Sequence, residues 1–178
     1  VTVGVYNTSN QTTTWLQTGL PAEQFLTNIA WSPDDKYIFI AVVNRQQNHM
    51  WLNQYDAITG AFVKTLFEET DAKYTEPLVP MLFVKNNPNQ FIWQSRRDGW
   101  NHLYLYDISG KLNKQSTSGM WEVLSVKGFD NDGKNIYYES TEVSPITKNL
   151  YSVNLKNLKT KKLTEAEGVH TTSISSTG

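Results

Sequence analysis

Apolar and polar positions alternate over residues 91–107 in a way that predicts two β-strands joined by a polar turn. Residues 91–94 are rich in aromatic side chains, and residues 102–107 place two leucines on one face and two tyrosines on the other. Between them, residues 96–99 end in Asp98-Gly99, a pair that readily adopts the positive φ of a tight turn. We interpret this hairpin as one copy of a unit that recurs along the chain.

Two kinds of anchor position repeat three times along the chain. An aromatic residue that precedes a turn stands at Trp31, Phe83 and Phe129, which are 52 and 46 residues apart. The second anchors, 51 and 47 residues apart, are Tyr55-Asp56, Tyr106-Asp107 and Val153-Asn154. Because both landmarks keep the same phase, the pattern indicates an internal repeat.

Each repeat predicts four short β-strands joined by turn-forming residues. The strands are expected at residues 25–31, 36–43, 49–56 and 61–67 of the first repeat, 78–84, 90–95, 101–107 and 111–116 of the second, and 122–129, 135–140, 149–155 and 160–163 of the third. No segment longer than two helical turns shows helical periodicity. Four strands every ~40–50 residues are typical of a β-propeller blade.

The predicted fold class is therefore all-β, a partial β-propeller of about three four-stranded antiparallel blades with an incomplete blade at each end. The complete blades are expected at residues 25–67, 78–116 and 122–163, and the partial ones at residues 1–19 and 169–178, within a single propeller domain over residues 1–178. Residues 37–43 are apolar on both faces, as a sheet stacked between two others requires. A two-layer sandwich, whose strands alternate more strictly, is the alternative.

Both ends of the chain fall inside a predicted blade. Tyr6-Asn7 stands 49 residues before Tyr55-Asp56 and so matches the third strand of a blade, whereas residues 170–175 match a first strand. We expect either a piece of a longer ring or a piece whose two ends complete one blade together. Open ends expose sheet faces and edges, so end-to-end pairing or homo-oligomerisation is expected.

Composition excludes several other classes of protein. The net charge of −1 gives no broad attraction to nucleic acid or to an anionic membrane. Cysteine is absent, which excludes a disulfide framework and fits the cytosol or a bacterial envelope compartment. No apolar run approaches the ~20 residues of a membrane-spanning helix, and the start at Val1 lacks the features of a targeting signal. We expect no cofactor.

The segment from Gln90 to Asp107 resembles the propeller domain of bacterial dipeptidyl peptidase IV, in the prolyl oligopeptidase-type family of serine peptidases. Other stretches match the same family in the same order: Asn44-Arg45-Gln46-Gln47-Asn48, Trp51-Leu52, Gly119-Met120-Trp121-Glu122-Val123 and Asn149-Leu150-Tyr151. The resemblance covers nearly the whole chain, most weakly before Gln24 and after Thr164. We interpret Trp121 and Glu122 themselves as packing residues.

The resemblance implies an N-terminal propeller above a C-terminal α/β-hydrolase domain that removes N-terminal dipeptides with proline or alanine second. It also implies a parent protein in the cell envelope or periplasm, or secreted, and a propeller that restricts the access of peptide substrate. The chain contains no Gly-x-Ser-x-Gly motif, so we expect this fragment to have no catalytic residues. The acidic pair with which the family holds the substrate's amino terminus is expected upstream. The alternative is a stand-alone propeller that scaffolds other proteins.

Residues 68–77 connect two predicted sheets and carry two candidate site residues, Tyr74 and Glu76. Because successive strands are antiparallel, this loop and the following one with Arg96 and Arg97 belong to the same face of a propeller. In the family that face looks toward the hydrolase domain, so these four side chains are expected to line the substrate cavity. Arginine would serve there as a bidentate partner for a carboxylate. The alternative is a solvated loop whose charges pair locally.

The remaining clusters of chemical side chains have a structural interpretation. His49, His102 and His170 are expected to be structural or surface histidines, because no elbow serine or cysteine accompanies them. Residues 130–139 carry part of a calcium-loop spacing, but the flanking strands favour a plain turn, and no metal site is expected. The basic run at residues 156–162 is interpreted as a solvated hairpin rather than a nucleic-acid patch.

Overall fold

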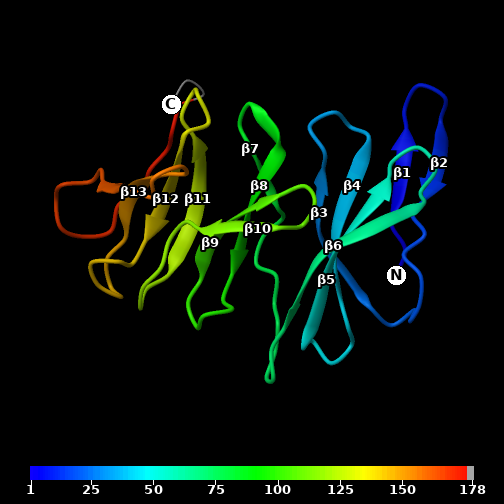
Figure 1. The fold of residues 1–178 in the computed structure, drawn as a ribbon, viewed down its shortest axis with the longest axis horizontal. Helices are drawn as coiled ribbons and strands as arrows, with labels where there is room; N and C mark the ends of the chain where they lie inside the picture. The colour runs from blue at the N-terminus through cyan, green and yellow to red at the C-terminus, as the bar shows by residue number, and fades with distance from the viewer. Residues whose placement is uncertain (176–178) are drawn as a thin grey trace. The chain divides into compact units, whose positions relative to one another are not determined.

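The structure is a computed structural model that describes residues 1–175, and it is built from β-strands (Figure 1). The strands are β1 (Gly4–Asn7), β2 (Thr12–Trp15), β3 (Phe25–Trp31), β4 (Tyr37–Val43), β5 (His49–Asp56), β6 (Phe62–Thr70), β7 (Leu82–Val84), β8 (Asn87–Ser95), β9 (His102–Asp107), β10 (Leu112–Gln115), β11 (Val123–Phe129), β12 (Asn135–Ser140), β13 (Asn149–Asn154) and β14 (Thr160–Lys162). Among the described residues no helix is long and apolar enough to cross a membrane.

The strands form three four-stranded sheets and one two-stranded sheet. The orders are β3-β4-β5-β6, β10-β9-β8-β7, β11-β12-β13-β14 and β1-β2, so each strand neighbours the next one in the chain. Neighbouring strands pair in the antiparallel direction in β1–β2, β3–β4–β5–β6, β8–β9–β10 and β11–β12–β13–β14. Short connections between neighbouring strands favour this meander, because antiparallel strands can be joined by tight turns. The all-β, four-stranded architecture predicted from the repeat is confirmed.

The chain divides into two compact units, which we describe separately. Unit 1 contains Val1–Leu82 and Ile108–Lys111, and unit 2 contains Phe83–Asp107 and Leu112–Gly178. The sheet β3–β6 and the pair β1–β2 therefore belong to unit 1. The sheets β7–β10 and β11–β14 belong to unit 2, apart from Leu82.

In unit 1 the core lies against β4, the strand that is apolar on both faces. Residues 38–43 have exposed fractions of 4% or less, which explains why this run contains no polar side chain. One side of the core joins Ile38, Ile40 and Val42 to Tyr55 and to Leu16, which follows β2. The β1–β2 pair is also tied to the β5–β6 turn, because Gln17 N donates to Gly60 O at 2.8 Å.

Glycine at position 60 is required by this packing. Gly60 adopts a φ of 74°, and a Cβ there would lie 2.3 Å from the carbonyl oxygen of Trp15. A side chain would therefore strain the turn and push β2 away from it. The Thr-Gly pair of the repeat is thus a packing requirement of unit 1.

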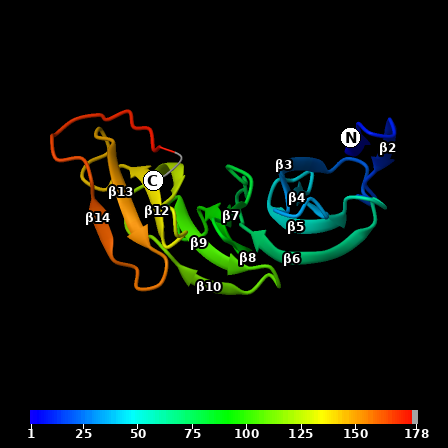
Figure 2. The same cartoon turned by 90° about the horizontal axis from the view of Figure 1, so that it is seen from above.

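In unit 2 the two sheets share one core, and Figure 2 shows them side by side. The β7–β10 sheet contributes, among others, Ile92, Leu103 and Leu105, and the β11–β14 sheet contributes Ile136 and Val153. Their exposed fractions are 3% or less. Both sheets therefore bury a face in the same interior, as stacked blades do.

Most predicted strands have a boundary that is shifted by one to four residues; β8, for example, starts at Asn87 rather than at residue 90. β7 starts at Leu82 rather than at residue 78, because Pro77 and Pro80 cannot donate a ladder hydrogen bond. β6 continues to Thr70 and shortens the following loop to residues 71–77. Residues 170–175 form no strand, although Lys148 and Val169 make an isolated parallel bridge. The last three residues of the predicted segment 169–178 lie outside the described residues.

Candidate functional site

Residues 74–77 of the 71–77 loop line a cavity of about 440 Å³ in unit 1, which we call the Tyr74 cavity. Its lining combines apolar side chains from β3 and β4 with polar side chains from two loops: Phe25, Thr27, Val43, Gln47, Tyr74, Thr75, Glu76 and Pro77. Two of the four predicted site residues, Tyr74 and Glu76, are therefore in this lining. Both are exposed, and 58% of the Tyr74 surface is accessible to solvent.

The backbone of the 71–77 loop is fixed although its side chains are exposed. Asp71 Oδ1 accepts hydrogen bonds from the backbone amides of Lys73 and Tyr74, at 2.7 and 3.2 Å. Thr75 N donates to Gln47 O at 2.6 Å, which ties the loop to the connection between β4 and β5. The buried Thr75 anchors the middle of the segment. The loop thus presents Tyr74 and Glu76 from a defined backbone.

The Tyr74 cavity offers three kinds of contact to a bound molecule. Phe25, Val43 and Pro77 supply apolar surface, while Glu76 supplies a carboxylate and Tyr74 an aromatic ring with a hydroxyl. A peptide with an amino group and a small apolar side chain could use all three. These are contacts through which the lining could bind a ligand.

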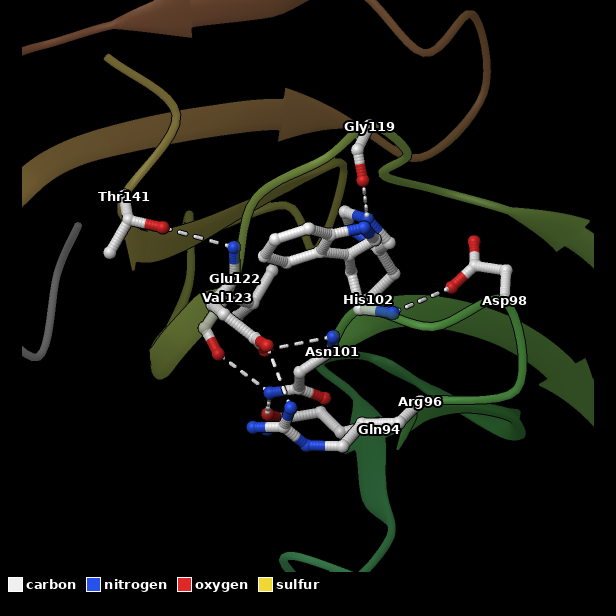
Figure 3. Close-up of polar contacts among 10 residues, drawn as sticks. Gln94, Arg96, Asp98, Asn101, His102, Gly119, Glu122, Val123 and Thr141 are labelled. Atoms are coloured by element: carbon white, nitrogen blue, oxygen red, sulfur yellow. Dashed lines mark hydrogen bonds and ion pairs between the residues drawn. The ribbon is translucent and has the colours of Figure 1, made fainter. Parts of the chain in front are cut away.

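The other two predicted residues, Arg96 and Arg97, lie in unit 2 and are engaged in contacts there. Figure 3 shows Arg96 beside Glu122. Arg96 Nη1 is 2.7 Å from Glu122 Oε1. Arg97 donates to the hydroxyl of Tyr106 at 2.7 Å, and its guanidinium lies 4.3 Å from the centroid of the Tyr104 ring. A stacked, hydrogen-bonded arginine holds the β8–β9 loop against β9.

A polar network with a buried centre at Gln94 and Asn101 joins the β8–β9 loop to the start of β11, and we call it the Asn101 network. Its members are Gln94, Arg96, Asn101, Glu122, Val123 and Thr141 (Figure 3). Asn101 Nδ2 donates to Val123 O at 2.6 Å and to Gln94 Oε1 at 3.1 Å, and Asn101 N donates to Glu122 Oε2 at 2.9 Å. Asn101 is 3% exposed. The network therefore fixes both loops from inside.

The histidines make structural contacts. His102 is fully buried; its Nε2 lies 2.9 Å from Gly119 O and its Nδ1 lies 3.0 Å from Thr117 Oγ1. His49 lies 2.7 Å from Glu68 and stacks on Trp51 at 3.7 Å, while His170 contacts Ala166 O. Across the described residues, no three His, Cys, Asp or Glu side chains converge as metal ligands would.

Asp130 and Glu139, which belong to the calcium-like spacing, serve different purposes. Burial favours a higher pKa for Asp130, but hydrogen bonds from Asn135 and from the Lys134 amide hold its pKa below the usual value. Its carboxylate is thus occupied by its own turn. Glu139 lies toward the other end of β12. It is four residues beyond Asn135, the residue that holds Asp130, which corresponds to roughly 13 Å along an extended strand. The structure therefore has an ordinary turn at residues 130–134.

The family model described as the dipeptidyl peptidase IV (DPP IV) N-terminal region matches residues 1–178, the whole chain. This chain belongs to the DPP IV N-terminal region family. As a member of that family it has a propeller-type fold, and the predicted partial β-propeller is confirmed.

Relatives and solved structures agree with this family. Dipeptidyl peptidase 4 of Trichophyton equinum is 33% identical over 95 residues, which are 52% of this chain and 12% of that protein. Inactive dipeptidyl peptidase 10 of Rattus norvegicus is 25% identical over 144 residues, which are 76% of this chain and 18% of that protein.

A putative dipeptidyl aminopeptidase IV from Bacteroides ovatus superposes with a TM-score of 0.85 at 35% identity, over 89% of this chain and 25% of that one. Porphyromonas gingivalis dipeptidyl peptidase 4 superposes with a TM-score of 0.82 at 25% identity, over 94% and 24%. This DPP IV N-terminal region thus spans about a quarter of each solved chain, and less of the curated relatives.

Sequence reasoning did not foresee how Glu139 is bound in this DPP IV N-terminal region. Its carboxylate is 3% exposed and faces Lys127 Nζ at 3.2 Å and Lys148 Nζ at 3.5 Å. Burial alone would raise the pKa of Glu139, but hydrogen bonds from Thr172, Ser125 and Lys127 outweigh it and lower the pKa to about 2. These partners are far from Glu139 in the sequence, so no local motif predicts the contacts.

The apolar wall of the Tyr74 cavity was not predicted either. Phe25 and Val43 belong to paired positions on β3 and β4, and they resemble core residues in the sequence. Gln47 lies in the stretch of residues 44–48 that carries part of the family resemblance, and this was the one available signal.

Proposed function

We propose that this chain is the non-catalytic propeller part of a serine dipeptidyl peptidase that removes N-terminal Xaa-Pro or Xaa-Ala dipeptides. In this role it limits access to the catalytic centre and contributes to substrate binding. The proposal is supported by the family match over residues 1–178 together with the position of Tyr74 and Glu76 at one cavity. The peptidase activity belongs to the whole protein, of which this chain is about a quarter in the solved relatives.

The chemistry of bond cleavage would come from a C-terminal α/β-hydrolase domain. A serine of that domain would attack the peptide carbonyl, and an oxyanion hole of the same domain would stabilise the intermediate. The chain described here contains no Gly-x-Ser-x-Gly motif and would take no part in this step. On the same resemblance we place the parent protein in the cell envelope or periplasm, or outside the cell.

The Tyr74 cavity would receive part of the bound peptide. Glu76 would attract a positively charged group of the substrate, and Tyr74 would cover an adjacent apolar portion with its ring. Arg96 and Arg97 are not in the lining of the Tyr74 cavity. That they line the substrate cavity of the whole enzyme stays a prediction, and their contacts with Glu122, Tyr104 and Tyr106 favour a structural role.

The experiment measures kcat/KM of the full-length enzyme for a Gly-Pro chromogenic dipeptide. Tyr74→Ala and Glu76→Gln are each expected to lower kcat/KM by about tenfold, because each removes a substrate contact. Lys73→Ala is the matched control: Lys73 lies in the same exposed loop but not in the cavity lining, so its kcat/KM stays within about twofold. Unchanged values for both cavity variants would remove this loop from the substrate site.

A second function is a stand-alone propeller that scaffolds other proteins. One observation favours it: a relative that matches 76% of this chain carries the name inactive dipeptidyl peptidase 10, so family membership does not by itself establish activity. The full reading frame discriminates the two functions. A nucleophile elbow downstream of the propeller supports the peptidase, whereas a stop codon directly after the propeller supports the scaffold.

A further inference from the structure

A second and larger hollow of about 690 Å³ lies in unit 2, and we call it the lysine recess. Its rim carries four lysines, Lys85, Lys114, Lys134 and Lys156, and one acidic residue, Asp132. Buried apolar side chains such as Leu105 and Leu155 also line it, together with several asparagines. Both sheets of unit 2 contribute to the lining.

The walls of the lysine recess are tied together by contacts between the two sheets. Asn86 Nδ2 donates to Asn131 O at 2.8 Å, and Lys85 Nζ donates to Asn131 Oδ1 at 3.2 Å. Gly133 packs so closely that a Cβ there would lie 2.0 Å from Lys85 O. On the other side, Lys114 Nζ donates to Lys156 O at 2.9 Å. The recess is therefore formed before any ligand arrives.

The charge of the lysine recess is unusual for this chain. Its lining carries four ammonium groups and one carboxylate, a net charge of +3, whereas the whole chain has a net charge of −1. Lys134 and Asp132 form an ion pair at 2.7 Å and offset each other. The two equivalent turns in the sheet of unit 1 carry Asp34, Asp35 and Asp56 and a single lysine, Lys36, so their net charge is negative. A basic lining is thus specific to this recess, not a general property of these turns.

We propose that the lysine recess binds a small molecule that carries a diphosphate or comparable multivalent phosphate group. Lysine ammonium groups act as compact positive charges for phosphate oxygens, and the side-chain amides of Asn113 and Asn157 add neutral donors. The buried Leu105 and Leu155 give an organic portion of the ligand an apolar contact. A volume of about 690 Å³ is ample for a molecule of that size.

The recess lies at the end of its sheets away from the Asn101 network. It includes Asn87, where β8 begins, whereas the network includes Gln94, near the end of β8. An extended strand of this length spans roughly 25 Å. The proposed binding is therefore separate from the peptidase function, and it can be tested without measuring cleavage.

The test is a calorimetric titration of the full-length protein with inorganic diphosphate at two salt concentrations. Wild type is expected to show saturable binding of one diphosphate per chain. The double variant Lys114→Gln/Lys156→Gln is expected to bind at least tenfold more weakly. The matched control is Lys159→Gln/Lys161→Gln, which removes the same amount of charge from the basic run that contains Lys156 but outside the lining, and it is expected to stay within twofold of wild type.

Lys114→Gln also removes the hydrogen bond from Lys114 Nζ to the backbone carbonyl of Lys156, so it could change stability as well as binding. The second variant is therefore Lys156→Glu, which changes an exposed side chain and keeps that hydrogen bond. It is expected to weaken diphosphate binding at least tenfold while the melting temperature without ligand stays at the wild-type value. Absence of saturable binding to wild type would overturn the proposal. An equal loss of binding in the recess and control variants would also overturn it, since that would indicate general attraction to positive charge.

Discussion

The 71–77 loop and the β8–β9 loop look alike in the sequence but differ in what their side chains contact. Both follow long strands and combine charged with aromatic residues. In the 71–77 loop the backbone is anchored while Tyr74 and Glu76 remain exposed beside a cavity. In the β8–β9 loop Arg96 and Arg97 are bound to side chains of unit 2. A charged loop residue is thus available for a ligand only when the sheets supply no partner for it.

The largest effect is expected for the carboxylate with the most complete set of partners, Glu139. Because its pKa is lowered from 4.5 to about 2, it contributes stability above pH 4.5, and this contribution is lost as the pH falls toward 2. The loss amounts to about 3 kcal/mol. The measurement is the free energy of unfolding between pH 7 and pH 2 for wild type and Glu139→Gln.

Glu76→Gln is the control for this acid titration, since Glu76 is an exposed side chain of the contrasting loop. It should keep the wild-type loss of stability between pH 4.5 and 2, whereas the loss in Glu139→Gln should be smaller by about 3 kcal/mol. The rest of the acid loss comes from other carboxylates with a lowered pKa, such as Asp130. An acid loss of the same size in Glu139→Gln would show that the Lys127 and Lys148 contacts do not stabilise the fold.

The next largest effect is expected at the centre of the Asn101 network. Asn101→Leu leaves the buried carbonyl of Val123 and the Gln94 side chain without their donor, which costs about 2 kcal/mol of unfolding free energy. Chemical denaturation of the full-length protein measures this change. The exposed Asn89→Ala, in the same unit, should change stability by less than about 0.5 kcal/mol. Equal effects of the two variants would refute the network.

A smaller effect is expected from the arginine that stacks on β9. Arg97→Lys loses the planar contact with Tyr104 and weakens the bond to Tyr106, at a cost of about 1 kcal/mol. Arg96→Lys, which changes a half-exposed ion pair with Glu122, should cost less than about 0.5 kcal/mol. If Arg97→Lys instead lowered kcat/KM at unchanged stability, Arg97 would belong to the substrate cavity after all.

The smallest stability effect is expected in the 71–77 loop. Tyr74→Ala removes an exposed ring and leaves the hydrogen bonds of Asp71 and Thr75 intact, so the free energy of unfolding should change by less than about 0.5 kcal/mol. Thermal unfolding of the variant measures this. A loss above 1 kcal/mol would mean that Tyr74 is a packing residue, and the contrast between the two loops would disappear.

The repeat was sufficient to predict the fold because each sheet is built from neighbouring strands. Aromatic anchors at Trp31, Phe83 and Phe129 mark the ends of first strands, and short turns place the next strand alongside. The exceptions have local causes, such as Pro80 before β7. At residues 170–175 the structure has no strand within the described residues.

The candidate site could be predicted only in part. Tyr74 and Glu76 could be proposed because a polar loop between predicted sheets is a recognisable feature. The structure places both in the lining of one cavity, and their contact with substrate stays a prediction. The contacts of Arg96 and Arg97 depend on Glu122, Tyr104 and Tyr106, and their pairing requires the register of β8 with β9 and the approach of β11. The sequence holds no local sign of such distant partners.

The most direct test of the central claim is selective modification of a cysteine placed at Tyr74 of the full-length enzyme. The chain has no cysteine of its own, so Tyr74→Cys and the control Lys73→Cys each add one thiol to it. Modification with a small thiol reagent is predicted to lower kcat/KM at least about tenfold at position 74 and less than about twofold at position 73. Complete modification at position 74 with wild-type kcat/KM would contradict the assignment of this cavity to the substrate.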